Sequence, residues 1–519
     1  MHSLISRKSR RVIPRWRLAS DNDALRYSEG NKNFTPLVLN SDLEKSYVKW
    51  SSTKSPDSAI ELAIAFEAFG DWSSISREKI QSEFIQYGGC DIALKLMERA
   101  EATQAIQSNY MLPSSRDGIG AQLRLARNAT RSQPLSSFAW LALARSYTIL
   151  GLHSSKKCEQ AIKIACQLSP SSRYVARVAV RYFIHRELPD RAIDVLAKSG
   201  RALSDPWLAS ALIASREIAQ TPQKSVNRLL RLSNDPTWTT FSRSELLTGL
   251  ASLEAGHGSD RTAKKLFNVA ITDPTENALA QAQWFSNFHQ NLVIPQETID
   301  NTRAFEAMET RAFKNGNWGK VLESSRAWQA VEPFSKRPAL NGSMVALSVL
   351  NDPNAALELM KPAYIANPTD QTVANNYAVS LVCSGQLMEA SKIIKTAVEN
   401  GKDTEIHSLM ATTGLLLFRA GDTENGREFY TNARIALRKD KNRRNEFICG
   451  LYWAREEAIA GNLERSEQLI TEAKSAYKVY KDDKLASAAL KSLGEHKAIT
   501  PQSEAIITPH LPLNIDIFN

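Results

Sequence analysis

Cysteine is scarce in this chain of 519 residues, and the spacing of its cysteines excludes several kinds of site. The five cysteines are scattered and odd in number, and no two of them form a C-x-x-C pair. This pattern indicates neither a disulfide framework nor a zinc site. Thiols buried in a reducing compartment are the simpler interpretation, because free cysteine is often found inside proteins.

Long apolar runs are also missing. No run approaches the ~18–20 apolar residues that a membrane-spanning helix needs, so we expect no membrane span. Arg10 and Arg11 are similar to a twin-arginine export signal, but residues 14–17 stand where its apolar stretch would have to be. We therefore expect a cytoplasmic protein. An organellar transit peptide is the alternative, since the first twenty residues are rich in arginine and serine and contain no acid.

Catalytic motifs are missing as well. The eight histidines never pair at the spacing of metal ligands on a helix, and the chain contains neither H-E-x-x-H nor G-x-S-x-G. Residues 315–321 are superficially similar to a phosphate-binding loop, but Lys314 stands where the first glycine belongs, and no Ser or Thr follows Lys320. We therefore predict a protein that is not an enzyme and that holds no metal and no cofactor.

Acidic residues are absent from the N-terminal segment, which makes the charge uneven. The formal net charge is +10, and residues 1–17 contribute +6 of it through Arg7, Lys8, Arg10, Arg11, Arg15 and Arg17. A second basic cluster consists of Arg438, Lys439, Arg443 and Arg444. Such cations can contact phosphates or an acidic protein surface. An unstructured tail is the alternative interpretation of the N-terminal arm.

What the chain does contain is a repeat. A turn followed by the start of a helix recurs five times between Phe305 and Ala473, and a small residue falls each time at the same place: Val321, Ala355, Ala390, Gly426 and Ser466. The intervals are 34, 35, 36 and 40 residues, which is typical of stacked helical hairpins. Larger side chains four and seven positions later form the stripe of an amphipathic helix. The small residue allows two helices to cross closely, and the glycine before it suits a left-handed helix end.

The repeat predicts an all-α fold, a superhelical solenoid of stacked helix-turn-helix hairpins, because one hairpin cannot bury its apolar face alone. The pattern resembles that of the tetratricopeptide repeat family. Its best match runs through Trp140, Leu143, Ala144, Tyr147, Gly151, Cys158, Ile162, Ala165 and Pro170. The resemblance covers roughly residues 120 to 480. It implies a groove lined by the first helix of each hairpin.

The repeat breaks at two places, and these breaks suggest how the chain is divided. Between Pro274 and Phe305 the register slips, which we interpret as a bend, and the 40-residue interval inserts residues 438–444. The tail contains three prolines after residue 500 and cannot be a continuous helix. We expect five parts: a basic arm with an irregular segment (1–41), degenerate hairpins or an N-terminal cap (42–135), an N-terminal solenoid (136–290), a C-terminal solenoid (300–480), and a capping helix with a tail (481–519).

Basic residues on the expected first helices are candidate partner contacts. Four of them recur at four-residue intervals on one helix: Arg173, Arg177, Arg181 and His185. Arg145 takes the place of Arg181 on the helix before. A solvated face is one interpretation, and a site for a carboxylate or phosphate is the other. Replacing Arg177 and Arg181 with alanine is expected to weaken binding without lowering stability, since solvated charges contribute little to folding.

Two asparagines form a second candidate set. Asn341 and Asn376 stand 35 residues apart at the same place on consecutive first helices. The family resemblance implies that asparagine there holds the backbone of a bound peptide, because its amide offers a donor and an acceptor. A surface asparagine without a ligand is the alternative.

These observations predict a non-catalytic scaffold or adaptor subunit of a multiprotein assembly, which binds one or more proteins or peptides in its concave groove. The alternative is a nucleic-acid-associated regulatory subunit that contacts phosphates through the basic arm and the Arg438–Arg444 insert.

Overall fold

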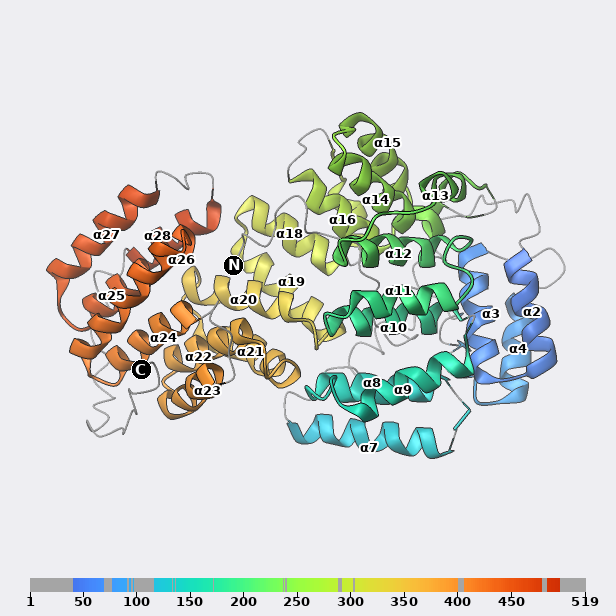
Figure 1. Cartoon of the computed structure of the whole chain (residues 1–519), viewed down its shortest axis with the longest axis horizontal. Coiled ribbons are helices and arrows are strands. Elements are labelled where there is room, and N and C mark those ends of the chain that lie inside the picture. The colour runs from blue at the N-terminus through green and yellow to red at the C-terminus, as the bar shows by residue number, and fades with distance from the viewer. Residues whose placement is uncertain are drawn as a thin grey trace. The chain divides into compact units, whose positions relative to one another are not determined.

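The structure, a computed structural model, describes the chain from residue 41 to residue 494, with gaps. The described residues are 41–69, 77–90, 93–94, 97, 116–132, 134–135, 137–170, 172–236, 238, 240–287, 292–301, 304–399, 406–477 and 483–494. They form 25 helices and no strand, as the repeat predicts (Figure 1). The basic arm and the proline-containing tail lie outside them.

The chain divides into two compact units. The N-terminal unit holds residues 2–310 and 330–332, and the C-terminal unit holds residues 311–329 and 333–519. The five-part division expected from the sequence stays a prediction.

Helices of the N-terminal unit pair into hairpins. They are α2 (Ser41–Thr53), α3 (Pro56–Phe69), α4 (Arg77–Tyr87), α7 (Arg116–Ser132), α8 (Ser137–Ile149), α9 (Lys156–Leu168), α10 (Arg173–His185), α11 (Pro189–Lys198), α12 (Pro206–Ile218), α13 (Val226–Ser233), α14 (Thr240–Gly256), α15 (Asp260–Ala270), α16 (Glu276–Ser286), α17 (Gln296–Asn301) and the start of α18 (Phe305–Asn315). First helices such as α14 and α16 are buried on most sides, whereas α9 buries a single stripe. The first helices therefore form the inner layer. The slip in the repeat register between Pro274 and Phe305 includes α17, which has only six residues.

The three helices α2, α3 and α4 belong to the core of this unit. Trp50, Ile60 and Phe84 share one apolar cluster with Ile213 and Leu250 of the hairpins. Figure 1 shows the three helices together in blue. They cover apolar surface that the hairpins would otherwise expose, which is what a cap of a solenoid does.

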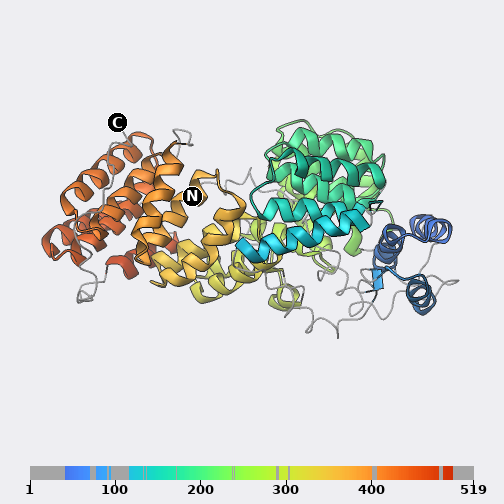
Figure 2. The ribbon, with the colours of Figure 1, turned by 90° about the horizontal axis from the view of Figure 1, so that it is seen from below.

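The C-terminal unit continues the hairpins. Its helices after α18 are α19 (Trp318–Val331), α20 (Lys336–Ser348), α21 (Pro353–Ala366), α22 (Gln371–Cys383), α23 (Leu387–Glu399), α24 (Ile406–Arg419), α25 (Thr423–Lys439), α26 (Arg443–Ile459), α27 (Leu463–Tyr477) and α28 (Lys484–Gly494). Figure 2 shows the helices from α21 onward stacked in chain order, from orange to red. Side chains of α19 to α27 share one apolar cluster that runs from Leu322 to Ile470.

The turns and crossings of these hairpins follow the predicted chemistry. Gly316, Gly385, Gly421 and Gly461 all have positive φ, which glycine adopts most readily. At the crossing of α24 and α25, a Cβ on Gly426 would lie 2.6 Å from Phe418 Cδ2. The prediction that a small residue marks each crossing is therefore confirmed at this position.

The expected basic insert is a correction to the sequence interpretation. Residues 438–444 do not form an added loop, because only residues 440–442 separate α25 from α26. Each of these two helices has 17 residues, against 13 in α22 and α23. The 40-residue interval thus comes from longer helices.

The last described helix closes the C-terminal unit. Leu485 of α28 is fully buried with Ala312, Val321 and Val345, which come from α18, α19 and α20. The next apolar positions of α28 pack on α26 and α27. The predicted capping helix therefore contacts both the first and the last hairpins of its unit.

Candidate partner-binding site

Three arginines of α10 lie in internal ion pairs of the N-terminal unit. Arg173 Nε lies 2.7 Å from Asp205 Oδ2, Arg181 Nε lies 2.8 Å from Glu332 Oε1, and Arg177 contacts both oxygens of Glu245 at 3.1 Å. Arg173 and Arg181 are buried, and the Arg177 side chain is only 11% exposed.

The expectation that these arginines form a solvated face is therefore wrong. The four-residue spacing does indicate carboxylate binding, but the chain supplies the carboxylates itself. They stand 32, 68 and 151 residues away in the sequence, so the local pattern could not show them. That the arginines also bind a partner stays a prediction.

Glu245 is the centre of this network. Besides Arg177, its carboxylate accepts hydrogen bonds from Thr275 Oγ1 and Asn277 Nδ2, each at 3.2 Å. The Arg177 guanidinium also lies 4.7 Å from the centre of the Trp207 ring. One carboxylate thus connects α10, α14 and the start of α16, and so joins first helices that are not all neighbours in the chain order.

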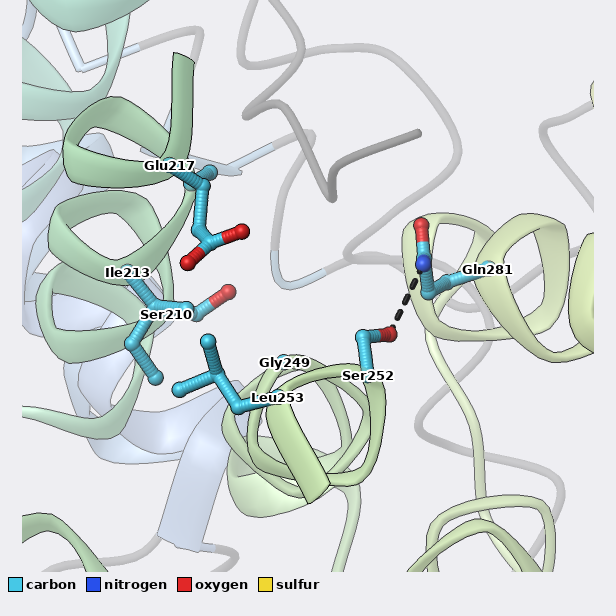
Figure 3. Close-up of a pocket in the computed structure, with 8 residues that line it drawn as sticks. Ser210, Ile213, Glu217, Gly249, Ser252, Leu253 and Gln281 are labelled. Carbon is cyan, nitrogen blue, oxygen red and sulfur yellow. Dashed lines mark hydrogen bonds between the residues drawn. The ribbon is translucent and has the colours of Figure 1, made fainter. Parts of the chain in front are cut away.

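A pocket lies on the first helices α12, α14 and α16. Its wall consists of Ser210, Ile213, Ala214, Glu217, Gly249, Ser252, Leu253 and Gln281 (Figure 3). Together they surround about 250 Å³ of free space, part of it open to solvent. The sequence interpretation missed this site. Ser210 and Glu217 stand seven residues apart, which puts them on one helix face, and that spacing is the signal that could have indicated it.

The polar groups of the pocket differ in whether they make hydrogen bonds within the described residues. Gln281 Nε2 donates to Ser252 Oγ at 2.8 Å, and Ser252 Oγ donates to Thr248 O at 2.8 Å. Ser210 is 1% exposed, and its hydroxyl has no hydrogen-bond partner within the described part of the chain. In Figure 3 the Ser210 hydroxyl and the Glu217 carboxylate face the same space, across from Ser252 and Gln281.

Comparison with known proteins identifies the hairpins. The sequence model of the tetratricopeptide repeat matches residues 350–412, which span α21, α22, α23 and part of α24. Residues 350–412 therefore carry a tetratricopeptide repeat. An adaptor kind of role in protein–protein interaction fits this repeat.

Two further comparisons add little to this match. No curated protein matches its sequence. Among solved structures, the crystal structure of yeast Tom70 matches with 13% identity and a TM-score of 0.28, over 85% of this chain and 96% of that chain. At this TM-score the likeness supports no inference about function or location.

The other partner contacts predicted from the sequence, Arg145, Asn341 and Asn376, are not among the residues that form the pocket. Arg145 is half-buried on α8, and its Nε makes no hydrogen bond within the described residues. Asn341 and Asn376 are half-buried on α20 and α22 of the C-terminal unit. Asn376 Nδ2 donates to Thr372 O of its own helix at 2.8 Å. A role of Arg145, Asn341 and Asn376 in binding a partner stays a prediction.

The second basic cluster is partly neutralised by neighbouring acids. Arg438 Nη2 lies 2.6 Å from Glu446 Oε1, and Arg444 Nε lies 3.0 Å from Asp483 Oδ2. Lys439 and Arg443 are exposed. Phosphate binding by these four residues stays a prediction, and the same holds for the arm, which lies outside the described residues.

The cysteines are free thiols, and several are poor nucleophiles. Burial raises the pKa of Cys158 and Cys166 to about 11 and that of Cys449 to about 12. A thiol reacts as the thiolate, so these three are held in the unreactive form at neutral pH. Among the described residues, no three His, Cys, Asp or Glu side chains group as a metal site, and no helix is long and apolar enough to cross a membrane.

Proposed function

We propose that this protein is a non-catalytic adaptor subunit of a multiprotein assembly, and that it binds a protein partner at the inner surface of its N-terminal unit. The pocket on α12, α14 and α16 carries this proposal, because three consecutive first helices direct polar groups to one space. We place the protein in the cytoplasm, on the support of its five free thiols. Arg145, Asn341 and Asn376 are additional candidate contacts.

Contacts between first helices that are not neighbours in the chain order occur in both units, as Arg177 of α10 and Glu245 of α14 show for the N-terminal one. In the C-terminal unit, first helices that are not neighbours in the stack already touch one another. Ser348 of α20 and Tyr452 of α26 have hydroxyls 3.2 Å apart, and Arg455 of α26 donates to Cys383 Sγ of α22 at 3.5 Å. Together with α28, these contacts occupy inner surface that a partner would need.

Replacing Ser252 with arginine tests the proposal. Ser252 is half-buried at the pocket, so a long side chain there would fill the space that the partner uses. Full-length wild type and Ser252→Arg would be compared as baits in extract of the source cells, with quantitative mass spectrometry. We expect a defined set of proteins to be retained by the wild type and lost from the variant. Gln167→Arg is the matched control, because it adds the same charge at an exposed position of the second helix α9.

Gly249→Ala separates binding from folding. The three atoms nearest to a Cβ at this position all belong to Ile213, the closest at 3.5 Å, so alanine fits without a clash. Alanine in a helix interior is better than glycine by roughly 0.5–1 kcal/mol. We expect a more stable protein with a narrower pocket and weaker retention of the same partners. Unchanged partner sets for both Ser252→Arg and Gly249→Ala would refute this site.

A further inference from the structure

We infer that the exposed face of α7 binds an acidic, amphipathic helix of a protein partner. This face, the α7 surface, consists of Arg124, Leu125, Arg127, Asn128 and Arg131, all of them exposed. The other side of α7 is buried and packs on α8. Figure 1 shows α7 in cyan beside α8. None of these residues forms the pocket, so the inference concerns a second site and goes beyond the proposed function.

Negative charge is missing from this part of the chain. Residues 118–158 contain six Lys or Arg and no Asp or Glu, although Asp and Glu make up 55 of the 519 residues. This stretch covers nearly all of α7, all of α8 and the first residues of α9. The hairpin that carries the α7 surface therefore offers no carboxylate of its own to the arginines.

Two arginines of the α7 surface differ from exposed arginines elsewhere in the protein. Arg326, for example, lies 2.7 Å from a carboxylate oxygen of Glu358. Arg124 and Arg131 make no ion pair and no side-chain hydrogen bond within the part of the chain that the structure describes. Their charges are therefore available to an anion from outside.

Arg127 is the third cation, and α8 fixes its position. Its Nη2 donates to the Tyr147 hydroxyl at 3.4 Å, and its guanidinium lies 5.6 Å from the centre of that ring. A phenol group orients the guanidinium but does not neutralise it. Arg127 thus holds its charge at a defined place, with Arg124 one turn before it and Arg131 one turn after it.

The spacing of the three arginines fits a partner helix. Arg124, Arg127 and Arg131 are three and four residues apart, so they form a row of about 10 Å along α7. Acidic residues at the same intervals on a second helix form a row of equal length. The two rows can face each other when the helices lie side by side. Each arginine can hold a carboxylate through two parallel hydrogen bonds, which gives the contact a defined geometry.

Leu125 favours a protein partner over a nucleic acid. Its side chain is 68% exposed on the same face of α7. An apolar side chain of a partner helix would remove Leu125 from water, which is favourable, whereas a row of phosphates offers it no apolar surface. The partner helix therefore combines carboxylates with an apolar residue on one face.

The experiment uses two designed peptides as probes. Both are alanine-based, carry a fluorophore and have about 18 residues, or about five helical turns. The first peptide carries three glutamates at the intervals of the arginines, with leucines beside them. The second has the same composition, with the glutamates moved to different faces. Fluorescence anisotropy with the full-length protein should show about tenfold tighter binding of the first peptide. Equal affinities would mean diffuse attraction to positive charge, and the inference would fail.

Charge reversal on α7 locates the site. The double variant Arg124→Glu, Arg131→Glu should bind the first peptide about tenfold more weakly, because two attractive pairs become repulsive. Arg261→Glu with Lys265→Glu is the matched control, since both positions are exposed on α15 and the change in net charge is the same. An equal loss in the control would contradict a site on α7.

Exchanging the charges between protein and peptide separates recognition from misfolding. A version of the first peptide with lysines in place of its two outer glutamates should bind the Arg124→Glu, Arg131→Glu protein and should not bind the wild type. Thermal unfolding of the double variant should match that of the wild type, because neither arginine contacts other described side chains through its charge. A lysine peptide that binds neither protein would count against the α7 surface.

Leu125→Ala and an RNA probe distinguish the two classes of partner. Leu125→Ala should weaken binding of the first peptide several-fold, whereas Leu463→Ala, which removes another exposed leucine, should not. Ser252→Arg should also leave this affinity unchanged, so the pocket and the α7 surface are tested independently. A single-stranded RNA that binds more tightly than the peptide, and that loses affinity when Arg124 and Arg131 are reversed, would make the α7 surface a nucleic-acid contact and overturn the inference.

Discussion

At the scale of single residues, Arg177 is a charged side chain for which the sequence pattern favours a solvated position, but it lies in the interior. Its guanidinium lies on the Trp207 ring and contacts both oxygens of Glu245, whose side chain is 3% exposed. A two-point contact between arginine and a carboxylate is stronger and more directional than a single ion pair. Breaking it would leave a buried carboxylate with hydrogen bonds from Thr275 and Asn277 but without its cation.

Arg177→Ala should therefore destabilise the protein, in contrast to what the spacing of the arginines predicted. Removing one partner of a buried pair typically costs on the order of 3–5 kcal/mol. Urea unfolding followed by circular dichroism would measure the change. Arg326→Ala is the control, because its ion pair with Glu358 is 2.7 Å long but exposed, and such pairs contribute about 0–1 kcal/mol. Equal stability of the two variants would contradict the buried-pair interpretation.

At the scale of elements, close helix crossings depend on glycines that lie inside helices. Gly414 of α24 and Gly426 of α25 face each other, and a Cβ on Gly414 would lie 2.9 Å from Tyr430 Cδ2 and 3.0 Å from Gly426 O. Gly342 of α20 is equally crowded, with Leu359 Cδ1 at 2.6 Å from its ideal Cβ position. Three consecutive hairpins therefore include two crossings at which a side chain larger than hydrogen has no room.

Gly426→Ala should destabilise the C-terminal unit by about 1–3 kcal/mol, the usual cost of overpacking a core. The added methyl group must displace Phe418, which is itself buried. Gly319→Ala on α19 is the matched control, since nothing lies within 4 Å of its ideal Cβ position, and its stability should be unchanged or slightly higher. Thermal unfolding of both variants would measure the two changes in stability. An unfolding temperature of Gly426→Ala equal to that of the wild type would show that the helix crossing is less tightly packed than described.

At the scale of the whole molecule, the excess of positive charge bears on whether the protein is an adaptor for proteins or binds nucleic acid. Two of the four cations in the second basic cluster are paired with Glu446 and Asp483. The arm contributes +6 of the net charge of +10. A segment with this much positive charge is able to neutralise phosphates, and its binding would then weaken steeply with salt.

Full-length protein and a chain that starts at Ser20 would be titrated against a mixed-sequence duplex and an RNA at two salt concentrations. We expect negligible binding by both, because the repeats and the pocket favour a protein partner. If the arm does bind nucleic acid, only the full-length protein should bind. Its affinity should then fall with salt, with a slope of log affinity against log salt concentration of about 4–5, because each phosphate contact contributes ~0.7–0.9 and the arm offers ~6 contacts. That result would replace the adaptor proposal with the nucleic-acid alternative.

The sequence by itself determined the parts of this protein that depend on local periodicity. The repeat interval, the apolar stripe of the second helices and the glycines of the turns are all set by residues within one or two hairpins, and they predicted an all-α solenoid with tetratricopeptide-like hairpins. Gly426 was predicted to lie at a close crossing for the same reason. Each of these features needs only neighbouring residues to be read.

Only the tertiary structure decided which side chains meet across hairpins. Arg177 pairs with Glu245, which is 68 residues away in the sequence, and Arg181 pairs with Glu332, which is 151 residues away. The helical period therefore could not indicate either partner. The pocket likewise joins three helices, and none of its polar residues is unusual on its own helix. A solenoid brings such residues together because each hairpin adds a small rotation to the stack, and that rotation is set by packing between hairpins, which the spacing of residues does not encode.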